Sequence, residues 1–256
     1  MDNRSAPMVA NVPLTETRRN YVPRGGFFIA LEGIDGAGTS TQTRALAQRL
    51  IDDLGERVHM TCEPSRGPIG RMIREQLSAG AGALNAETLA LLFAADRLDH
   101  YKREILPALE GGRVVISDRY VLSSLVYQSL ECPAEWVETI NARAPWPDLC
   151  VLVDLPWEEA LARVARRRAT SGEEKERYDE PDLQRRLAEG YGRARDAQRP
   201  GPIVTIDGGL TIDEVTERLF EAVRARLKGG LVRPSGLAAT PLPSRCRPSP
   251  SDTAST

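Results

Sequence analysis

The first residues in this chain that suggest chemistry form a glycine-rich stretch, GIDGAGTS, at positions 33–40. The stretch follows an apolar run and precedes an amphipathic pattern, which is the context that gives the phosphate-loop signature G-x-x-x-x-G-K-[ST] its meaning. Glycines let successive backbone N–H groups turn inward, and the following helix adds its positive end, so the segment can bind an anion. Ser40 stands where a hydroxyl would hold Mg²⁺, whereas Thr39 stands where the signature has lysine.

The missing lysine removes one positive charge from the surroundings of a transferred phosphoryl group. Because loss of one preorganised donor typically costs about 10²–10³ in rate, an active enzyme needs a cation from elsewhere. The sequence offers two sources, the run RVARRR at 163–168 and Arg177. Two other interpretations stay open here: a glycine-rich turn without a ligand, and a nucleotide-binding protein without catalysis.

Other polar residues follow the ends of apolar runs. Asp118 and Arg119 come after RVVIS, and Glu63 comes after RVHMTC. A carboxylate beside a phosphate loop can hold Mg²⁺ through water or steer the nucleophile. A guanidinium can clamp a phosphate with two hydrogen bonds. A buried structural ion pair is an equal alternative for Asp118 and Arg119.

Helical segments supply further candidates. Phe93 and Arg97 are four residues apart and therefore share a helix face, where a ring can stack on a base and a guanidinium can donate to a base carbonyl. Taken alone, such a pair is more often a core residue with a surface charge. Arg74 could bind a monophosphate or lie on a solvated helix. The charged segment 163–184 could be a mobile lid or a solvated helix end.

The elements that must position these residues alternate regularly. Short apolar runs separate helical patterns, one of which carries Leu46, Leu50 and Leu54 at helical spacing. This alternation predicts a parallel sheet covered by helices on both faces, with ligands at the carboxyl ends of the strands. The predicted strands are 27–33, 57–62, 113–118, 148–155 and 202–207, and further helices are predicted near 69–77, 87–110, 157–168, 183–199 and 212–227.

Length and composition limit the remaining possibilities. The 256 residues, with a net charge of −2, suit one α/β domain and show no basic excess for nucleic acid. We expect a domain at 26–228 between flexible tails at 1–25 and 229–256, which are polar or rich in proline and serine. The four cysteines lack zinc-like spacing, and no apolar run is long enough for a bilayer span. We therefore expect a cytoplasmic protein with no membrane partner.

Several motifs together resemble a known family. In order, FIALEGIDGAG, LLFAADR, DRYVLSSLVYQ and ERYD are similar to segments of the bacterial thymidylate kinases, and the similarity covers about 27–227. The combination of FAADR with DRY…S…YQ is specific among phosphate-loop kinases. The resemblance implies a three-layer P-loop kinase fold with a five-stranded parallel sheet flanked by helices. It also implies a homodimer that uses Mg²⁺ and transfers the γ-phosphoryl group of ATP to dTMP, giving dTDP and ADP.

The resemblance also assigns residues to roles. Donor phosphates would lie on the loop, and Mg²⁺ would be held by Ser40 and, through water, by Asp118. Phe93 would stack on thymine and Arg97 would donate to its O4, while Tyr127 would crowd the sugar 2′ position. Residues assigned to the ATP site are Gly33, Ile34, Asp35, Gly36, Ala37, Gly38, Thr39, Ser40 and Thr41. Residues assigned to the acceptor site are Asp35, Glu63, Arg74, Phe93, Arg97, Arg119, Ser124, Tyr127 and Gln128. The catalytic set comprises Asp118, Arg119, Arg166, Arg167 and Arg177, the last three from a lid at about 166–181.

The chain departs from the family pattern at Thr39, at Cys62, where an arginine is frequent, and at QSLECP after Tyr127. Family members without an arginine in the loop carry basic groups in the lid, and this chain has that combination. We therefore favour an active enzyme whose lid supplies the missing charge. The alternatives are a kinase for another nucleoside monophosphate and a catalytically impaired nucleotide-binding scaffold.

Overall fold

The computed structural model describes residues 25–78, 84–171 and 180–228. Both predicted tails lie outside these ranges, as do Arg177 and the middle of the predicted lid. The described helices and strands fall between Phe27 and Lys228, within the limits predicted for the domain. The division into one domain and two tails stays a prediction.

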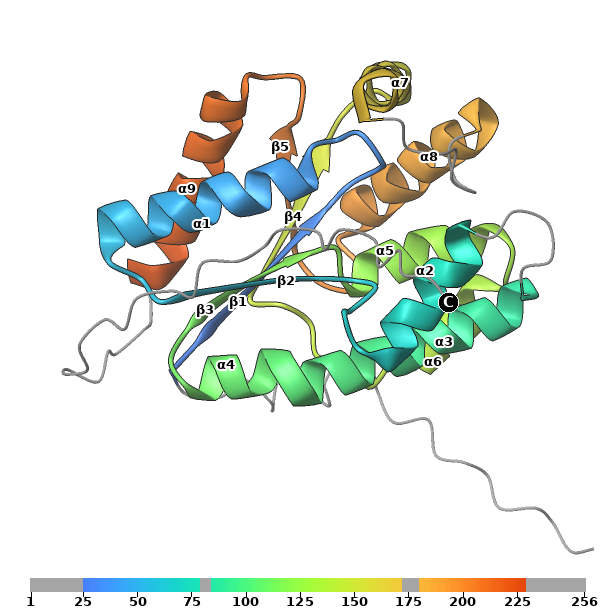
Figure 1. Cartoon of the computed structure of the whole chain (residues 1–256), viewed down its shortest axis with the longest axis horizontal. Helices are drawn as coiled ribbons and strands as arrows, with labels where there is room; N and C mark the ends of the chain where they lie inside the picture. The colour runs from blue at the N-terminus through green and yellow to red at the C-terminus, as the bar shows by residue number, and fades with distance from the viewer. Residues whose placement is uncertain (1–24, 79–83, 172–179, 229–256) are drawn as a thin grey trace, which may run out of the picture.

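The centre of the structure is a parallel sheet of five strands, which confirms the predicted fold class (Figure 1). The strands lie in the order β2-β3-β1-β4-β5, so the strand before the glycine-rich loop occupies the middle. In register, Ile29 of β1 pairs with Ile116 of β3 and with Leu149 of β4. The strands are β1 (Phe27–Glu32), β2 (Val58–Cys62), β3 (Val114–Asp118), β4 (Leu149–Asp154) and β5 (Ile203–Asp207).

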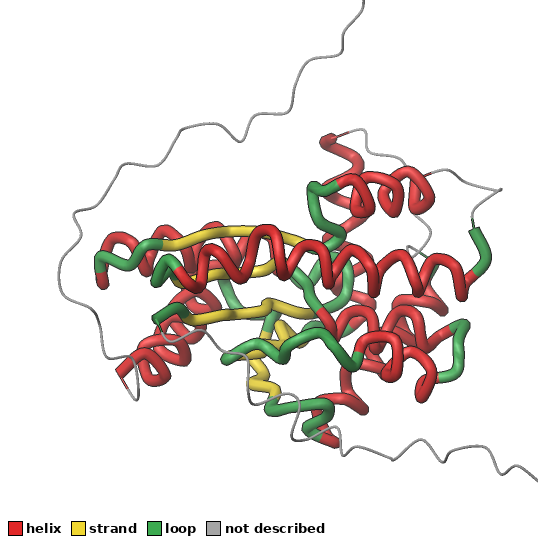
Figure 2. The backbone as a smooth tube through the Cα atoms, turned by 90° about the horizontal axis from the view of Figure 1, so that it is seen from below, coloured by secondary structure: helices red, strands yellow, loops and turns green. Residues whose placement is uncertain are grey.

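Helices cover both faces of the sheet and also form a separate group beside its carboxyl edge (Figures 1 and 2). The predicted helix at 87–110 is one continuous segment in which a π-helical turn, η1, separates a long α3 from a short α4. The helical elements are α1 (Thr39–Leu54), α2 (Pro68–Ser78), α3 (Ala86–His100), η1 (Tyr101–Ile105), α4 (Leu106–Glu110), α5 (Val121–Tyr127), η2 (Gln128–Leu130), α6 (Ala134–Asn141), α7 (Trp157–Ser171), α8 (Pro181–Ala197) and α9 (Ile212–Lys228).

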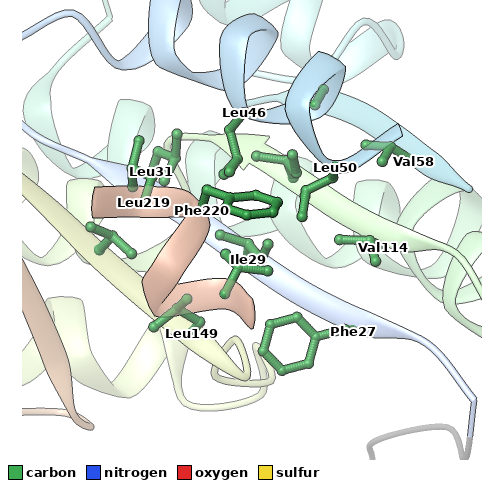
Figure 3. Packing of buried hydrophobic residues seen from close by; sticks show 14 of the residues in the cluster. Phe27, Ile29, Leu31, Leu46, Leu50, Val58, Val114, Leu149, Leu219 and Phe220 are labelled. Carbon is green, nitrogen blue, oxygen red and sulfur yellow. The ribbon is translucent and has the colours of Figure 1, made fainter. Parts of the chain in front are cut away.

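The alternation of side chains along β1 explains why helices are needed on both faces. Phe27, Ile29 and Leu31 point to one face and pack with residues of α1 and α9, such as Leu46 and Phe220 (Figure 3). The intervening residues Phe28 and Ala30 pack on the opposite face, among residues of η1 and α4. Burying one such side chain contributes about 1.5–3 kcal/mol, so the two cores hold β1 and its terminal loop rigidly.

Candidate active site

The glycine-rich loop connects β1 to α1 in a conformation that requires glycine. Gly36 and Gly38 have φ angles of 91° and 97°, in the left-handed region that other residues rarely adopt. A Cβ atom on Gly36 would lie 2.3 Å from the carbonyl oxygen of Ala160 in α7. Gly38 caps the N-terminus of α1. The loop therefore combines a close approach to α7 with the start of a helix, the arrangement that binds phosphate.

Two oxygen-bearing side chains stand at the end of this loop. Ser40 Oγ donates a hydrogen bond to Asp118 Oδ2 at the end of β3. Asp118 Oδ1 is buried and has no hydrogen-bond partner among the described residues. A serine hydroxyl beside a carboxylate oxygen that lacks a partner fits Mg²⁺, which prefers oxygen ligands and retains several waters. Both residues belong to the predicted metal set.

A cavity of about 460 Å³ opens along the loop on the β4–β5 side of the sheet. Its lining includes the predicted loop residues from Ile34 to Thr41 and two arginines of α7, Arg163 and Arg167. The other wall is formed by residues that sequence reasoning missed, namely Gly208, Leu210, Thr211, Ile212 and Val215. The sequence did contain one sign of these residues. A Gly-Gly pair follows the last predicted strand, and the end of that strand lies at the same edge of the sheet as the loop.

The helical geometry of α7 places some of the predicted arginines at the cavity and others away from it. Arg163 and Arg167 are four residues apart, share one face of the helix and line the cavity. Arg163 also forms an ion pair with Glu159 at 2.6 Å. Arg166 is exposed and is not part of the cavity lining, and Arg177 lies outside the described residues. Of the two described lid arginines in the predicted catalytic set, Arg167 is therefore the one that lies at the loop.

A second pocket of about 140 Å³ lies on the β2–β3 side of the sheet. It unites residues that are far apart in the sequence but were predicted to share one site. Gln128 Oε1 is buried there without a hydrogen-bond partner among the described residues, so the pocket offers an unused acceptor. Predicted residues in its lining are Asp35, Glu63, Phe93, Arg97, Arg119, Ser124, Tyr127 and Gln128.

Arg97 is held in this second pocket by several buried partners. Its side chain is only 1 % exposed and forms an ion pair with Glu63 at 2.7 Å, so the alternative of a solvated surface charge is wrong. Nη2 donates to Ser124 Oγ at 2.9 Å, and Nη1 donates to Asn141 Oδ1. His100 Nδ1 lies 3.2 Å from the other oxygen of Glu63. Asn141 and His100 were not foreseen, because they come from α6 and from the far end of α3.

Arg74 occupies a different position. Its guanidinium donates to the carbonyl oxygens of Pro64 at 2.7 Å and Ser65 at 2.6 Å. Arg74 is half-buried and is not part of the pocket lining, although Pro64 is. Its predicted contact with a monophosphate stays a prediction.

Asp35 and Arg119 line both cavities and form an ion pair at 2.6 Å. Arg119 adopts a φ of 68°, which is uncommon for a residue with a side chain, and Nη1 donates to the carbonyl oxygen of Gly33 at 2.7 Å. The guanidinium lies 5.1 Å from the centre of the Tyr127 ring. Burial raises the pKa of the Tyr127 phenol well above its ordinary value, so this hydroxyl stays neutral. The two pockets therefore meet at one ion pair.

The phosphate loop after a central parallel strand, together with two pockets that share an arginine, defines a P-loop nucleotide kinase. The sequence profile of the thymidylate kinase family matches residues 31–219, and the chain belongs to this family. A probable thymidylate kinase of Pyrococcus abyssi is 39 % identical over 210 residues, which are 80 % of this chain and 98 % of that protein. A probable thymidylate kinase of Pyrobaculum aerophilum is 40 % identical over 198 residues, or 77 % and 96 % of the two chains.

Both of these relatives are archaeal, so they support the family but not the bacterial branch named by the resemblance. Within the described residues, the structure contains no helix with the length and apolar character of a membrane span.

Proposed function

We propose that the chain transfers the γ-phosphoryl group of ATP to dTMP, giving dTDP and ADP. The observation that carries this proposal is the meeting of two pockets at the Asp35–Arg119 ion pair. A donor bound along the loop and an acceptor bound in the second pocket would place their phosphates on either side of Arg119. Catalysis then consists of positioning and charge neutralisation.

The larger cavity suits the donor. Inward-turned amides of residues 33–41 would hold the triphosphate, and the wall from Gly208 to Ile212 would border the nucleoside. Ser40 and, through water, Asp118 would hold Mg²⁺, which when bound offsets the negative charge of the donor oxygens. Arg167 and Arg163 would provide the positive charge that Thr39 lacks. Arg166 and Arg177 stay candidates from the sequence alone.

The smaller pocket suits the acceptor. Phe93 would stack on thymine, and Arg97 would donate to its O4 with the Nη1 hydrogen that is not directed at Asn141. Gln128 Oε1 could accept from the base, and Ser124 would be a further polar contact. Tyr127, whose hydroxyl lies 3.3 Å from Asp35 Oδ2, would crowd the sugar 2′ position. Arg119, assisted by Arg74, would bind the acceptor phosphate.

The chemical step needs few protein groups. An oxygen of the dTMP phosphate attacks the γ-phosphorus in line as the bond to the β-phosphate oxygen breaks. The acceptor phosphate is already ionised at neutral pH, so no strong base is required. Arg119 contacts the attacking group, and the arginines of α7 face the transferred group. Nucleotides that displace water from both pockets would strengthen these electrostatic contacts.

We further propose a cytoplasmic homodimer. Cys62, Cys132 and Cys150 are free thiols in the structure, which suits a reducing compartment. Met72 of α2 and Leu91 of α3 are 48 % and 49 % exposed, and these two helices pack against each other. We propose that these two side chains become buried in the dimer interface.

A coupled ADP-release assay with Mg·ATP and a panel of nucleoside monophosphates tests the proposed reaction. We expect dTMP to be the preferred acceptor, and Phe93→Ala to raise its KM by about tenfold, because one stacked aromatic contributes about 1–3 kcal/mol. Equal preference for another monophosphate, with no effect of Phe93→Ala, would indicate a different nucleotide kinase. Binding of Mg·ATP by calorimetry without turnover of any acceptor would indicate a scaffold.

A further inference from the structure

Arg119 has a set of buried partners, of which Glu32 and Tyr191 line neither pocket and Ser123 lines the second. Behind the guanidinium, Nη1 lies 3.2 Å from Ser123 Oγ and 3.4 Å from the Tyr191 hydroxyl. Ser123 Oγ donates to Glu32 Oε2 over 2.6 Å and lies 2.8 Å from the Tyr191 hydroxyl. Glu32 and Tyr191 are 0 % and 2 % exposed. These three partners come from β1, α5 and α8, which the fold brings together at the centre of the sheet edge.

The hydrogens of this set fix its direction. Glu32 Oε1 accepts from the backbone N–H of Tyr120 at 3.0 Å, and Oε2 accepts the single hydrogen of Ser123. The Tyr191 hydroxyl then donates either to Ser123 Oγ at 2.8 Å or to Glu32 Oε2 at 3.5 Å, and in both cases its lone pairs remain for Arg119 Nη1. The result is a chain from a guanidinium, through two hydroxyls, to a buried carboxylate. A carboxylate without solvent needs such donors, because burying an unpaired charge is costly.

We infer that Tyr191, Ser123 and Glu32 form a buried chain that positions the Arg119 guanidinium for the acceptor phosphate. This inference rests on the proposed function, which assigns that phosphate to Arg119. The α8 helix contributes Tyr191 as a positioning residue. A packing role alone would not use its hydroxyl, since phenylalanine fills nearly the same volume. Among the described residues, the hydrogen-bond partners of that hydroxyl are Ser123, Glu32 and Arg119, all of them members of this hydrogen-bonded chain.

The test measures how much the phosphate of the ligand contributes to binding. The affinities of dTMP and of thymidine are determined by calorimetry at pH 8, where Glu32 is mainly ionised, for the wild type and Tyr191→Phe. We expect the ratio of the thymidine Kd to the dTMP Kd to fall about 3- to 10-fold in Tyr191→Phe, the effect of one hydrogen bond. Thymidine affinity itself should not change, because thymidine lacks the group that Arg119 binds.

Ser123→Ala should lower the same ratio. The double variant, Ser123→Ala with Tyr191→Phe, should lower the ratio by less than the product of the two single effects, because both substitutions break the same hydrogen-bonded chain. Tyr101→Phe is the matched control: Tyr101 is 5 % exposed and lines neither pocket. An unchanged ratio in Tyr191→Phe overturns the inference, and so does an equal loss of dTMP and thymidine affinity.

The proposed function and this inference can fail independently of each other. If the panel assay selects another monophosphate, the same ratio is measured with that nucleotide and its nucleoside. A reduced ratio then supports the positioning chain although the dTMP assignment fails. A wild-type chain that binds no nucleoside monophosphate overturns both.

Discussion

Arg97 and Arg119 are both paired with carboxylates, yet their surroundings differ. Arg97 is 1 % exposed and is bound by Glu63, Ser124 and Asn141, so its guanidinium has little freedom to move. Arg119 lines both pockets and pairs with Asp35, which is partly exposed. A fixed arginine suits recognition of a base carbonyl. An arginine that lies where the two pockets meet can contact a phosphate in either pocket.

Sequence spacing identified Phe93 and Arg97 because the helical period places residues four apart on one face. It could not show that Arg97 is buried, since Glu63 and Asn141 lie 34 and 44 residues away. For the same reason the sequence named Arg119 but not Tyr191, which lies 72 residues further along the chain. Contacts between distant segments depend on how α3, α5, α6 and α8 pack, and no local pattern encodes that packing.

Glu32 gives a prediction about pH and stability. Burial raises the pKa of this carboxyl from 4.5 to about 7, although Ser123 and Arg119 favour its charged form. The folded protein therefore binds a proton more tightly than the unfolded chain, and stability should fall as pH rises from about 4.5 to about 7. Glu32→Gln should remove this decline, so urea denaturation at intervals from pH 5 to pH 8 should show the variant gaining on the wild type.

Exposed Glu110 provides the comparison, because Glu110→Gln should leave the pH dependence of the wild type intact. A decline of the same steepness in Glu32→Gln would show that another group causes it.

At the scale of elements, the strands were the most predictable part of the structure. Each predicted strand overlaps an observed one to within one residue at either end. The three central strands β1, β3 and β4 are short apolar runs buried along almost their whole length, which leaves few alternatives. The α5 and α6 helices, of 7 and 8 residues, were not predicted as separate elements, since two turns are too few to show a helical period. They carry Ser123 and Asn141, which the sequence did not point to, whereas Ser124 of α5 was named through the family resemblance.

The orientation of α7 leads to a prediction about catalysis. Arg167 lines the donor cavity with Arg163, and the helix is held near the loop by the contact between Gly36 and Ala160. If this face replaces the missing lysine, Arg167→Ala should lower kcat about 100-fold, as expected for loss of a preorganised charge. Steady-state kinetics with saturating ATP and dTMP would measure the effect.

The matched control is Arg218→Ala, which removes an exposed arginine of α9 outside the cavity lining. Full activity in both Arg163→Ala and Arg167→Ala would show that the α7 face does not replace the missing lysine. Arg177 would then remain as the candidate.

For the whole molecule, the exposed apolar residues of α2 and α3 predict its assembly. Leu91→Glu should place a charge in the proposed interface and convert a dimer into a single chain of 28.1 kDa, as measured by sedimentation velocity. Met60 of β2 is 48 % exposed, nearly the same as Leu91 at 49 %, and Met60→Glu serves as the control outside the two helices. Monomeric wild-type protein, or dimeric Leu91→Glu, would contradict the proposed interface.

The strand order has a consequence for how substrates come and go. Because β1 is central, residues after β4 and β5 line the cavity proposed for one nucleotide, while residues after β2 and β3 line the pocket proposed for the other. Each ligand would therefore enter from its own side of the sheet, and a bound ligand would not block entry of the other. We expect addition without a compulsory order, so ADP can be exchanged for fresh ATP while a thymidine nucleotide is still in place.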